Sequence, residues 1–153
     1  MSNNITIRKA LITDAPIIAG FNSAMALETE GKSLKEEKIK AGVENLFRHP
    51  EYGFYIVAEA ENRVIGCLLI TYEWSDWRNG LVWWIQSVYI HPDFRRQGIY
   101  RKMYAFIKNL ASSKTNVCGF RLYVEKENRV AQNTYKNLGM VETVYNMYEE
   151  MLG

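Results

Sequence analysis

Two periods of apolar residues run along this chain, and the change from one to the other separates predicted helices from predicted strands. Residues 5–10 (ITIRKA) alternate apolar and polar side chains, which predicts a short half-buried strand. Asp14 and Pro16 then signal the start of a helix. The apolar residues that share one face of this helix are Ile17, Ile18, Phe21 and Met25.

A second helix is predicted over residues 33–47, because Ser33 and Glu36 have the spacing of a capping box. Its buried stripe consists of Ile39, Val43, Leu46 and Phe47. From residue 54 the period changes to two and β-branched residues become frequent. Residues 54–74 are predicted as two strands joined at Glu61 and Asn62, and residues 81–90 as a third strand that ends before Pro92.

The last third of the chain combines helices and strands. After Gly98, apolar residues recur at helical spacing, and residues 119–125 alternate as a strand. Residues 128–139 form a short predicted helix that ends at Gly139, and residues 140–152 supply a last strand or two. This order predicts an α/β fold with a mixed sheet flanked by helices. With no linker or repeat, residues 1–153 are expected to form a single domain.

Composition and charge argue against several function classes. The formal charge is only +2 and no run of Lys or Arg is long, so nucleic-acid binding is not expected. No apolar segment suits a membrane span or a signal peptide, which predicts a cytoplasmic protein. Cys67 and Cys118 occur singly, and the two histidines lack ligand spacing. Buried free thiols and no metal site are therefore expected.

The stretch from His91 to Ile107 places Arg95 and Arg96 just before Gly98 and a predicted helix. A helix N-terminus exposes N–H groups without intrahelical partners and carries positive potential, so it favours an anion over a cation. Gly98 allows the backbone to come close, and the two guanidinium groups can neutralise phosphate oxygens. The turn is therefore a candidate diphosphate site, and the alternative is a solvated basic turn.

Two motifs resemble a known family. The segment RRQGIY (95–100) resembles the R/Q-x-x-G-x-G/A motif of the GNAT superfamily of N-acetyltransferases, which holds the pyrophosphate of acetyl-CoA. About thirty residues later, NRVAQNTYKNLGM is similar to the N-x-x-A-x-x-x-Y-x-x-x-G-F segment of the same family. Its matching residues are Asn128, Ala131, Tyr135 and Gly139, while Met140 replaces the usual Phe.

The resemblance implies a GNAT-like, mainly antiparallel sheet whose splayed central strands hold acetyl-CoA. It also implies transfer of the acetyl group to a primary amine of a small molecule or peptide. Tyr135 would be the catalytic acid that protonates the leaving thiolate, although it could instead be a packing residue. Tyr100 departs from the small residue of the motif, and it could crowd the cofactor or point away along the helix. The implied cofactor-binding residues are Val88, Tyr89, Ile90, Arg95, Arg96, Gln97, Gly98, Ile99, Tyr100, Arg101 and Asn128.

The sequence leaves the general base open. Gln86 occupies the position where some relatives carry a carboxylate, and an amide cannot accept a proton at neutral pH. Deprotonation could run through water, Glu73 or Glu28, or the amine could arrive neutral because its own pKa is low. Gln86 also makes a non-catalytic CoA-binding or regulatory module with the same fold the alternative to an enzyme.

Two stretches are candidates for binding the acceptor. Glu28 and Glu30, between the first two helices, could attract a cationic amine or could be solvated charges. Glu73, Trp74 and Trp77, in a hairpin, form an aromatic and acidic set that suits a cation. The two Trp residues could instead pack on a second subunit, so a homodimer is also expected.

Overall fold

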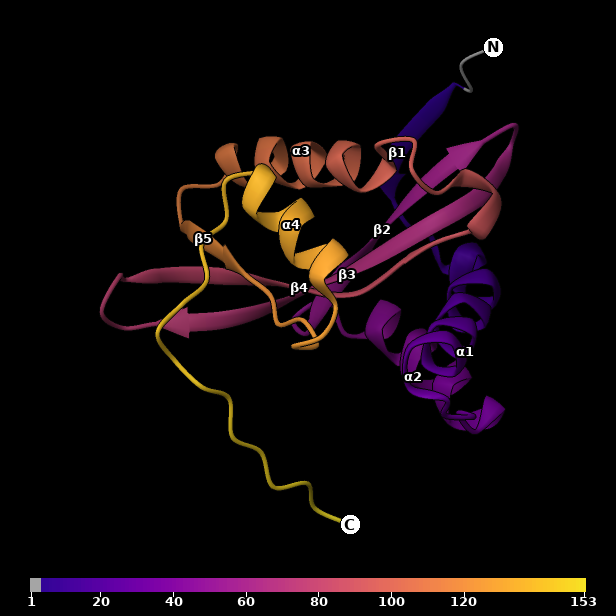
Figure 1. The fold of residues 1–153 in the computed structure, drawn as a ribbon, viewed down its shortest axis with the longest axis horizontal. Helices are drawn as coiled ribbons and strands as arrows, with labels where there is room; N and C mark the ends of the chain where they lie inside the picture. The colour runs from indigo at the N-terminus through magenta and orange to yellow at the C-terminus, as the bar shows by residue number, and fades with distance from the viewer. Residues whose placement is uncertain (1–3) are drawn as a thin grey trace. The chain divides into compact units, whose positions relative to one another are not determined.

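The structure, a computed structural model, describes residues 4–153 (Figure 1). The chain divides into two compact units, Met1–Leu122 and Tyr123–Gly153. The second unit contains α4 (Arg129–Asn137) and an extended segment after it. The helices and strands of the first unit are β1 (Ile5–Lys9), α1 (Ala15–Glu30), α2 (Glu36–Arg48), β2 (Gly53–Ala60), β3 (Arg63–Ser75), β4 (Gly80–Ile90), α3 (Ile99–Ser112) and β5 (Val117–Arg121).

The length of the second unit bears on the domain prediction. A segment this short, without a disulfide, is too small to bury a core of its own. That physical limit agrees with a single folding domain over residues 1–153, which stays a prediction.

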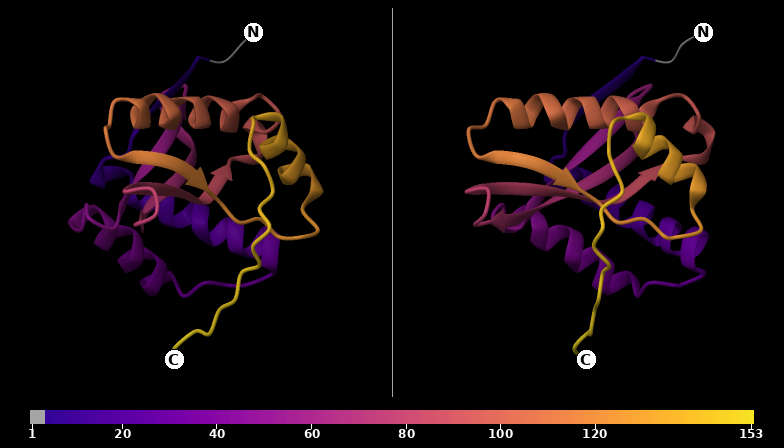
Figure 2. Two further views of the ribbon diagram at one scale, coloured as in Figure 1. Left: turned by 90° about the vertical axis from the view of Figure 1, so that its left-hand side faces the viewer. Right: turned by 60° about the vertical axis from the view of Figure 1, so that its left-hand side comes forward.

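The five strands form one sheet in the order β1-β2-β3-β4-β5. Neighbouring strands are antiparallel except β4 and β5, which run parallel and are connected through α3. Figure 2 shows α1 and α2 on one face of the sheet and α3 on the other. The mixed, mainly antiparallel sheet flanked by helices is therefore confirmed.

The β2–β3 hairpin turns where the sequence predicted it. Glu61 and Asn62 both have positive φ, 53° and 62°, which is the backbone of a tight turn whose twist matches its strands. The helix stripes are also largely confirmed, since Ile18, Phe21 and Val43 pack on β2 and β3. Ile17 is an exception, because Ile18 and Phe21 take the positions that face the sheet and leave Ile17 41% exposed.

Three predictions about local structure are wrong. The second helix begins at Glu36 and not at the predicted Ser33 cap. Lys35 is the N-cap residue, and its backbone carbonyl accepts the amides of Lys38 and Ile39 at 3.1 Å. The strand predicted over 119–125 lies at Val117–Arg121, and no strand forms over residues 140–153.

The two cysteines are both free thiols, but only one is buried. Cys67 is fully enclosed in the core, and this burial raises the pKa of its thiol to about 12. Cys118 is exposed, contrary to the prediction, because β5 is the edge strand of the sheet.

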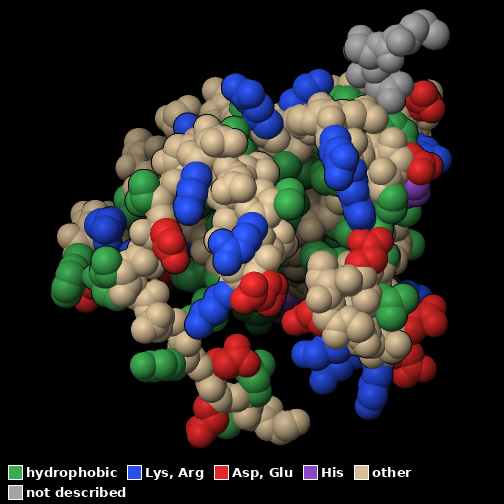
Figure 3. All heavy atoms as spheres, in the orientation of Figure 1, with side chains coloured by type: hydrophobic (Ala, Val, Ile, Leu, Met, Phe, Trp, Pro, Cys, Tyr) green, Lys and Arg blue, Asp and Glu red, His purple; other side chains and the backbone are tan. Residues whose placement is uncertain are grey.

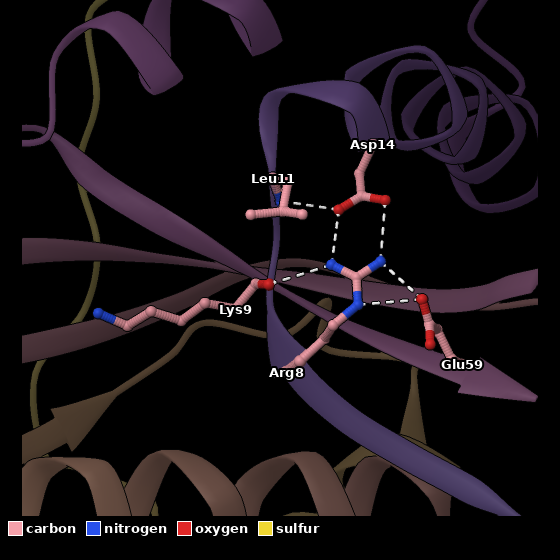
Figure 4. Close-up of polar contacts among 5 residues, drawn as sticks. All are labelled: Arg8, Lys9, Leu11, Asp14 and Glu59. Carbon is pink, nitrogen blue, oxygen red and sulfur yellow. Dashed lines mark hydrogen bonds and ion pairs between the residues drawn. The ribbon is translucent and has the colours of Figure 1, made fainter.

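An ion-pair cluster, shown in Figure 4, ties the start of α1 to the sheet. Arg8 of β1 donates to both carboxylate oxygens of Asp14, at 2.8 and 3.0 Å, and to Glu59 of β2 at 2.7 and 3.0 Å. Asp14 also accepts the backbone N–H of Leu11 at 2.7 Å. The Arg8 guanidinium lowers the pKa of Asp14 and outweighs the opposite effect of burial.

Over residues 4–153, no helix combines the length and hydropathy that a bilayer span requires. The face drawn in Figure 3 carries acidic and basic side chains close together and not in one basic stripe.

Candidate active site

The central strands separate within the first unit. β4 pairs with β5 only from Leu81 to Trp84, which faces Arg121. Beyond Trp84, no strand among residues 4–122 continues along that edge of β4. Backbone N–H and C=O groups on this side of the strand can therefore bond a ligand.

A β-bulge in β4 lies beside this separation. The register with β3 changes between Cys67, which faces Tyr89, and Leu69, which faces Gln86. Ser87 has φ of 51°, and Ser87 and Val88 together lie opposite the single residue Leu68. The bulge bends the strand at Val88, the first of the predicted cofactor-binding residues Val88, Tyr89 and Ile90.

The turn that follows β4 has the backbone geometry of an anion site. A short 3-10 helix over Pro92–Phe94 leads to Arg96 and Gly98, whose φ values of 63° and 74° are both left-handed. Gly98 is the N-cap of α3 and offers no side chain to cap it. The first N–H groups of α3 have no intrahelical acceptor, and the helix dipole adds positive potential there. Together these features suit a phosphate group.

The side chain of Arg95 contacts three groups of the protein. Its Nε donates to the carbonyl oxygen of Ile90 at 2.8 Å, and its Nη2 donates to Glu28 at 2.9 Å. The guanidinium also stacks over the ring of Tyr89, 5.3 Å from its centroid. Arg95 thus connects the end of α1 to the end of β4, and its contact with a phosphate stays a prediction.

The other residues of the turn differ in exposure. Arg96, Gln97 and Arg101 are exposed, whereas the side chain of Ile99 is buried. Ile99 can therefore meet a ligand only through its backbone. Tyr100 is half-buried and its ring stacks on Tyr104 of the next helical turn, with 6.2 Å between centroids. The sequence left two orientations of the Tyr100 side chain open, and this is the one that points along the helix.

A polar cluster crosses three strands on the face that α1 and α2 cover. Glu73 of β3 accepts from Arg121 of β5 at 2.7 and 2.9 Å and from the indole of Trp84 in β4 at 2.7 Å. These donors, Arg121 first, lower the pKa of Glu73. Gln86 donates to the hydroxyl of Thr71. Neither Glu73 nor Gln86 is therefore suited to accept a proton.

Sequence reasoning missed Arg121 and Trp84, the partners that determine the state of Glu73. Arg121 is 48 residues from Glu73 in the chain, and only the pairing of β3, β4 and β5 brings them together. The alternation in the predicted strand over 119–125 was the one available signal, since it places Arg121 on a sheet face.

The predicted acceptor residues do not form one cluster. Glu28 lies in the last turn of α1 and accepts from Tyr89 at 3.2 Å and from Arg95. Glu30 ends α1 and is exposed. Successive residues of a strand point to opposite faces, so Trp74 lies on the other side of β3 from Glu73. Trp77 lies at the tip of the hairpin and is 90% exposed.

The second unit holds the other motif. Asn128 is the N-cap of α4, and its side-chain oxygen accepts the backbone N–H of Ala131 at 3.2 Å. Tyr135 is half-buried, and this burial raises the pKa of its phenol, which keeps the proton in place at neutral pH. The roles of both residues in catalysis and binding stay predictions.

The chain resembles one known protein family and several solved structures. Residues 20–140 match the model of the acetyltransferase (GNAT) family. The chain belongs to the GNAT family of acetyltransferases. This match includes both motifs, from the turn before α3 and from α4.

Solved structures agree with the GNAT assignment. A possible acetyltransferase from Clostridium difficile 630 is 45% identical, with a TM-score of 0.90 and 97% of each chain covered. A predicted acetyltransferase from Clostridium acetobutylicum, solved with acetyl-CoA, is 18% identical, with a TM-score of 0.78 and 96% of each chain covered. An aminoglycoside N-acetyltransferase in complex with CoA is 16% identical, with a TM-score of 0.80, covering 99% of this chain and 97% of that one. At these lower identities the likeness shows the fold alone. No curated protein matches the sequence.

Proposed function

We propose that this GNAT protein transfers an acetyl group from acetyl-CoA to the primary amine of a small molecule or peptide. One observation carries the proposal. β4 leaves β5 after Trp84, and the strand then leads directly into the left-handed turn at Arg96 and Gly98. An open strand edge next to an anion-binding turn fits a ligand that has an amide-containing arm and a diphosphate.

The backbone would supply most of the binding. N–H groups around Gly98 and the start of α3 would hold the diphosphate, and the exposed Arg96 would neutralise its charge. The open edge of β4 at Val88 and Ile90 would bond the pantetheine arm and orient the thioester carbonyl. Because Ile99 is buried and Tyr100 stacks on Tyr104, these two residues would contribute through the backbone alone.

Bound acetyl-CoA would supply an activated acyl group, which the amine receives as an amide while the CoA thiol is released. A donor at the thiolate is then needed, and Tyr135 would provide the proton. Like any phenol, Tyr135 holds its proton at neutral pH, so the proton would be available for transfer.

The amine must lose a proton, and the candidate side chains differ in their suitability to accept it. Glu73 is a weak base because Arg121 and Trp84 donate hydrogen bonds to it, and Gln86 is an amide, which does not accept a proton. Glu28 also accepts hydrogen bonds, from Tyr89 and Arg95. The proton would therefore go to Glu28 or to water, or the amine would arrive neutral because its own pKa is low. Glu28 and the exposed Glu30 would also attract a cationic acceptor. A cytoplasmic location suits this reaction and stays a prediction.

The second candidate is a CoA-binding module without catalysis, favoured by the state of Gln86 and Glu73. The experiment separates the two by measuring CoA affinity by calorimetry and thiol release from acetyl-CoA with a panel of amines. We expect micromolar to millimolar CoA binding and amine-dependent thiol release. Binding without release for any amine would indicate the module, and no binding at low ionic strength would refute both.

Tyr135→Phe tests the proposed acid. We expect turnover to fall by about 100-fold or more with CoA affinity nearly unchanged, which is the range for loss of a general acid. Tyr52→Phe is the matched control, because Tyr52 is an exposed phenol in the turn before β2. Equal turnover in wild type and Tyr135→Phe would exclude Tyr135 from proton transfer.

A further inference from the structure

Three side chains from separate parts of the first unit meet at the end of β4. Glu28 lies in the last turn of α1, Tyr89 belongs to β4, and Arg95 follows the short 3-10 helix after β4. The Tyr89 hydroxyl donates to one carboxylate oxygen of Glu28 at 3.2 Å, and Nη2 of Arg95 donates to the other at 2.9 Å. The guanidinium also stacks over the Tyr89 ring, 5.3 Å from its centroid. Each of the three side chains therefore contacts the other two.

Arg95 is held by more than its ion pair with Glu28. An isolated ion pair with side chains 43% and 41% exposed contributes little, because two long side chains must be ordered to form it. Here the Nε of Arg95 also donates to the carbonyl oxygen of Ile90 at 2.8 Å, which ties the guanidinium to the backbone of β4. The ring on which it stacks is fixed as well, since Tyr89 is buried and packs 5.0 Å from the ring of Phe21 in α1. Glu28 is therefore bonded by two side chains that are themselves held in place.

The Glu28 carboxylate keeps capacity for a further donor. An ionised carboxylate accepts about four hydrogen bonds, and within residues 4–153 Glu28 accepts two, one at each oxygen. Its partner Tyr89 lies between Val88 and Ile90, on the stretch of β4 whose edge is open. α1 and α3 lie on opposite faces of the sheet (Figure 2). With a diphosphate at the start of α3, a second reactant can therefore approach this stretch from the side of Glu28.

We propose that Arg95 is a positioning residue for the acceptor, and that it acts by holding the Glu28 carboxylate in the orientation that binds an N–H group of the amine. The inference rests on the proposed acetyl transfer, and it assigns to Arg95 an effect on the amine and not on the diphosphate. A Glu side chain without fixed partners loses rotamer freedom when it binds a ligand. Arg95 has already removed that freedom, so the acceptor meets a carboxylate that needs no further ordering. The diphosphate is then left to Arg96 and to the N–H groups around Gly98.

The test compares Arg95→Gln, Glu28→Gln and the variant with both substitutions. Thiol release is measured at saturating acetyl-CoA with butylamine, 1,4-diaminobutane and a Lys-containing peptide, and the acceptor with the highest turnover is used to determine KM and kcat. We expect each single substitution to raise the KM of the acceptor by about 10-fold, the effect of losing one hydrogen bond to a charged group. The kcat of Arg95→Gln should stay within about 3-fold of the wild type, because the lost interaction concerns binding. The double variant should show no further rise in KM, because Arg95 acts through Glu28.

CoA affinity separates this role from a phosphate contact. By calorimetry, Arg95→Gln should bind CoA within about 3-fold of the wild type, whereas Arg96→Gln should bind it about 10-fold more weakly or worse. Arg95→Lys keeps a charge beside Glu28 but lacks the planar fork that also bonds Ile90, so its acceptor KM should lie between those of Arg95→Gln and the wild type. It takes the place of Arg95→Gln if that variant does not fold. Arg48→Gln, at an exposed arginine in the last turn of α2, is the matched control and should leave acceptor KM and CoA affinity unchanged.

Three outcomes would overturn the inference. An acceptor KM of Arg95→Gln equal to that of the wild type would do so, as would additive effects of the two substitutions. A loss of CoA affinity in Arg95→Gln as large as in Arg96→Gln would show instead that the guanidinium binds the phosphates. In each case a wild type that binds CoA and acetylates the amine leaves the proposed function standing. A wild type that releases no thiol with any amine would refute the proposed enzyme, and with it a role of Arg95 in acceptor binding.

Discussion

The cluster of Arg8, Asp14 and Glu59 makes a quantitative prediction about stability. Asp14 is only 8% exposed and its carboxylate accepts three hydrogen bonds, two of them from Arg8. Asp14→Asn keeps the shape of the side chain but removes the charge and turns an amide N–H₂ group toward the guanidinium. Arg8 keeps its bonds to Glu59, which limits the loss.

The expected loss of stability in Asp14→Asn lies between the values known for exposed and for buried ion pairs. An exposed ion pair contributes up to about 1 kcal/mol, while breaking a buried pair costs about 3–5 kcal/mol. The side chains of Arg8 and Asp14 are 28% and 10% exposed, so the pair is closer to the buried case. We expect Asp14→Asn to lower the free energy of unfolding by about 2–3 kcal/mol, measured by urea denaturation at pH 7 with an unchanged m-value.

The pH dependence gives a second measurement on the same variant. The pKa of Asp14 is lower in the folded chain than in the unfolded one, because Arg8 and the Leu11 amide favour the ionised form. The unfolded chain then binds more protons between these two pKa values, so stability rises with pH in that window. The stability that Asp14 contributes is complete above its ordinary pKa of about 3.9 and is lost as pH falls through the folded pKa.

The difference between wild type and Asp14→Asn should therefore be constant from pH 5 to 8 and shrink below about pH 4. Glu51→Gln is the control, since Glu51 is an exposed partner of His49 and its loss should not measurably change stability. A difference below about 0.5 kcal/mol at pH 7 would refute the assignment of a stabilising role to this cluster. So would a difference that does not change between pH 5 and pH 3.

Two further predictions concern residues of the sheet, Gly53 and Glu73, and the first is compared with a glycine in α2. Gly53 has φ of 154° and a Cβ there would lie directly on the carbonyl oxygen of Ile70, so Gly53→Ala should lower the free energy of unfolding by about 3 kcal/mol or more. Gly42→Ala, in α2 with nothing within 4 Å of the added carbon, should raise it by up to about 1 kcal/mol, and similar values for both would contradict the steric argument. Glu73→Gln should leave the acidic limb of the pH–rate profile of acetyl transfer in place, because Arg121 and Trp84 already hold this carboxylate ionised. Loss of that limb, with Asp76→Asn as the control, would instead identify Glu73 as the base.

Local sequence patterns predicted most helices and strands well, because the spacing of apolar residues and the residue types of a turn depend on neighbours in the chain. The β2–β3 turn is an example, since Glu61 and Asn62 both adopt the positive φ that a tight hairpin needs. The N-cap of α2 is a counterexample, because Ser33 and Glu36 have suitable spacing and yet the helix begins at Glu36. A capping motif also requires non-helical backbone angles at the N-cap residue, and the residue types alone do not determine those angles.

The contacts that determine chemistry were harder to predict, because they join residues far apart in the chain. That Gln86 cannot act as a base follows from the sequence alone, since an amide does not accept a proton at neutral pH. Glu73 was a reasonable candidate until the pairing of three strands placed Arg121 beside it. The contact of Arg95 with Glu28 at the end of α1 likewise joins residues far apart in the chain, and the sequence did not predict it. Side-chain type predicts what a residue can do, but the partner selected by the sheet determines which of those options is used.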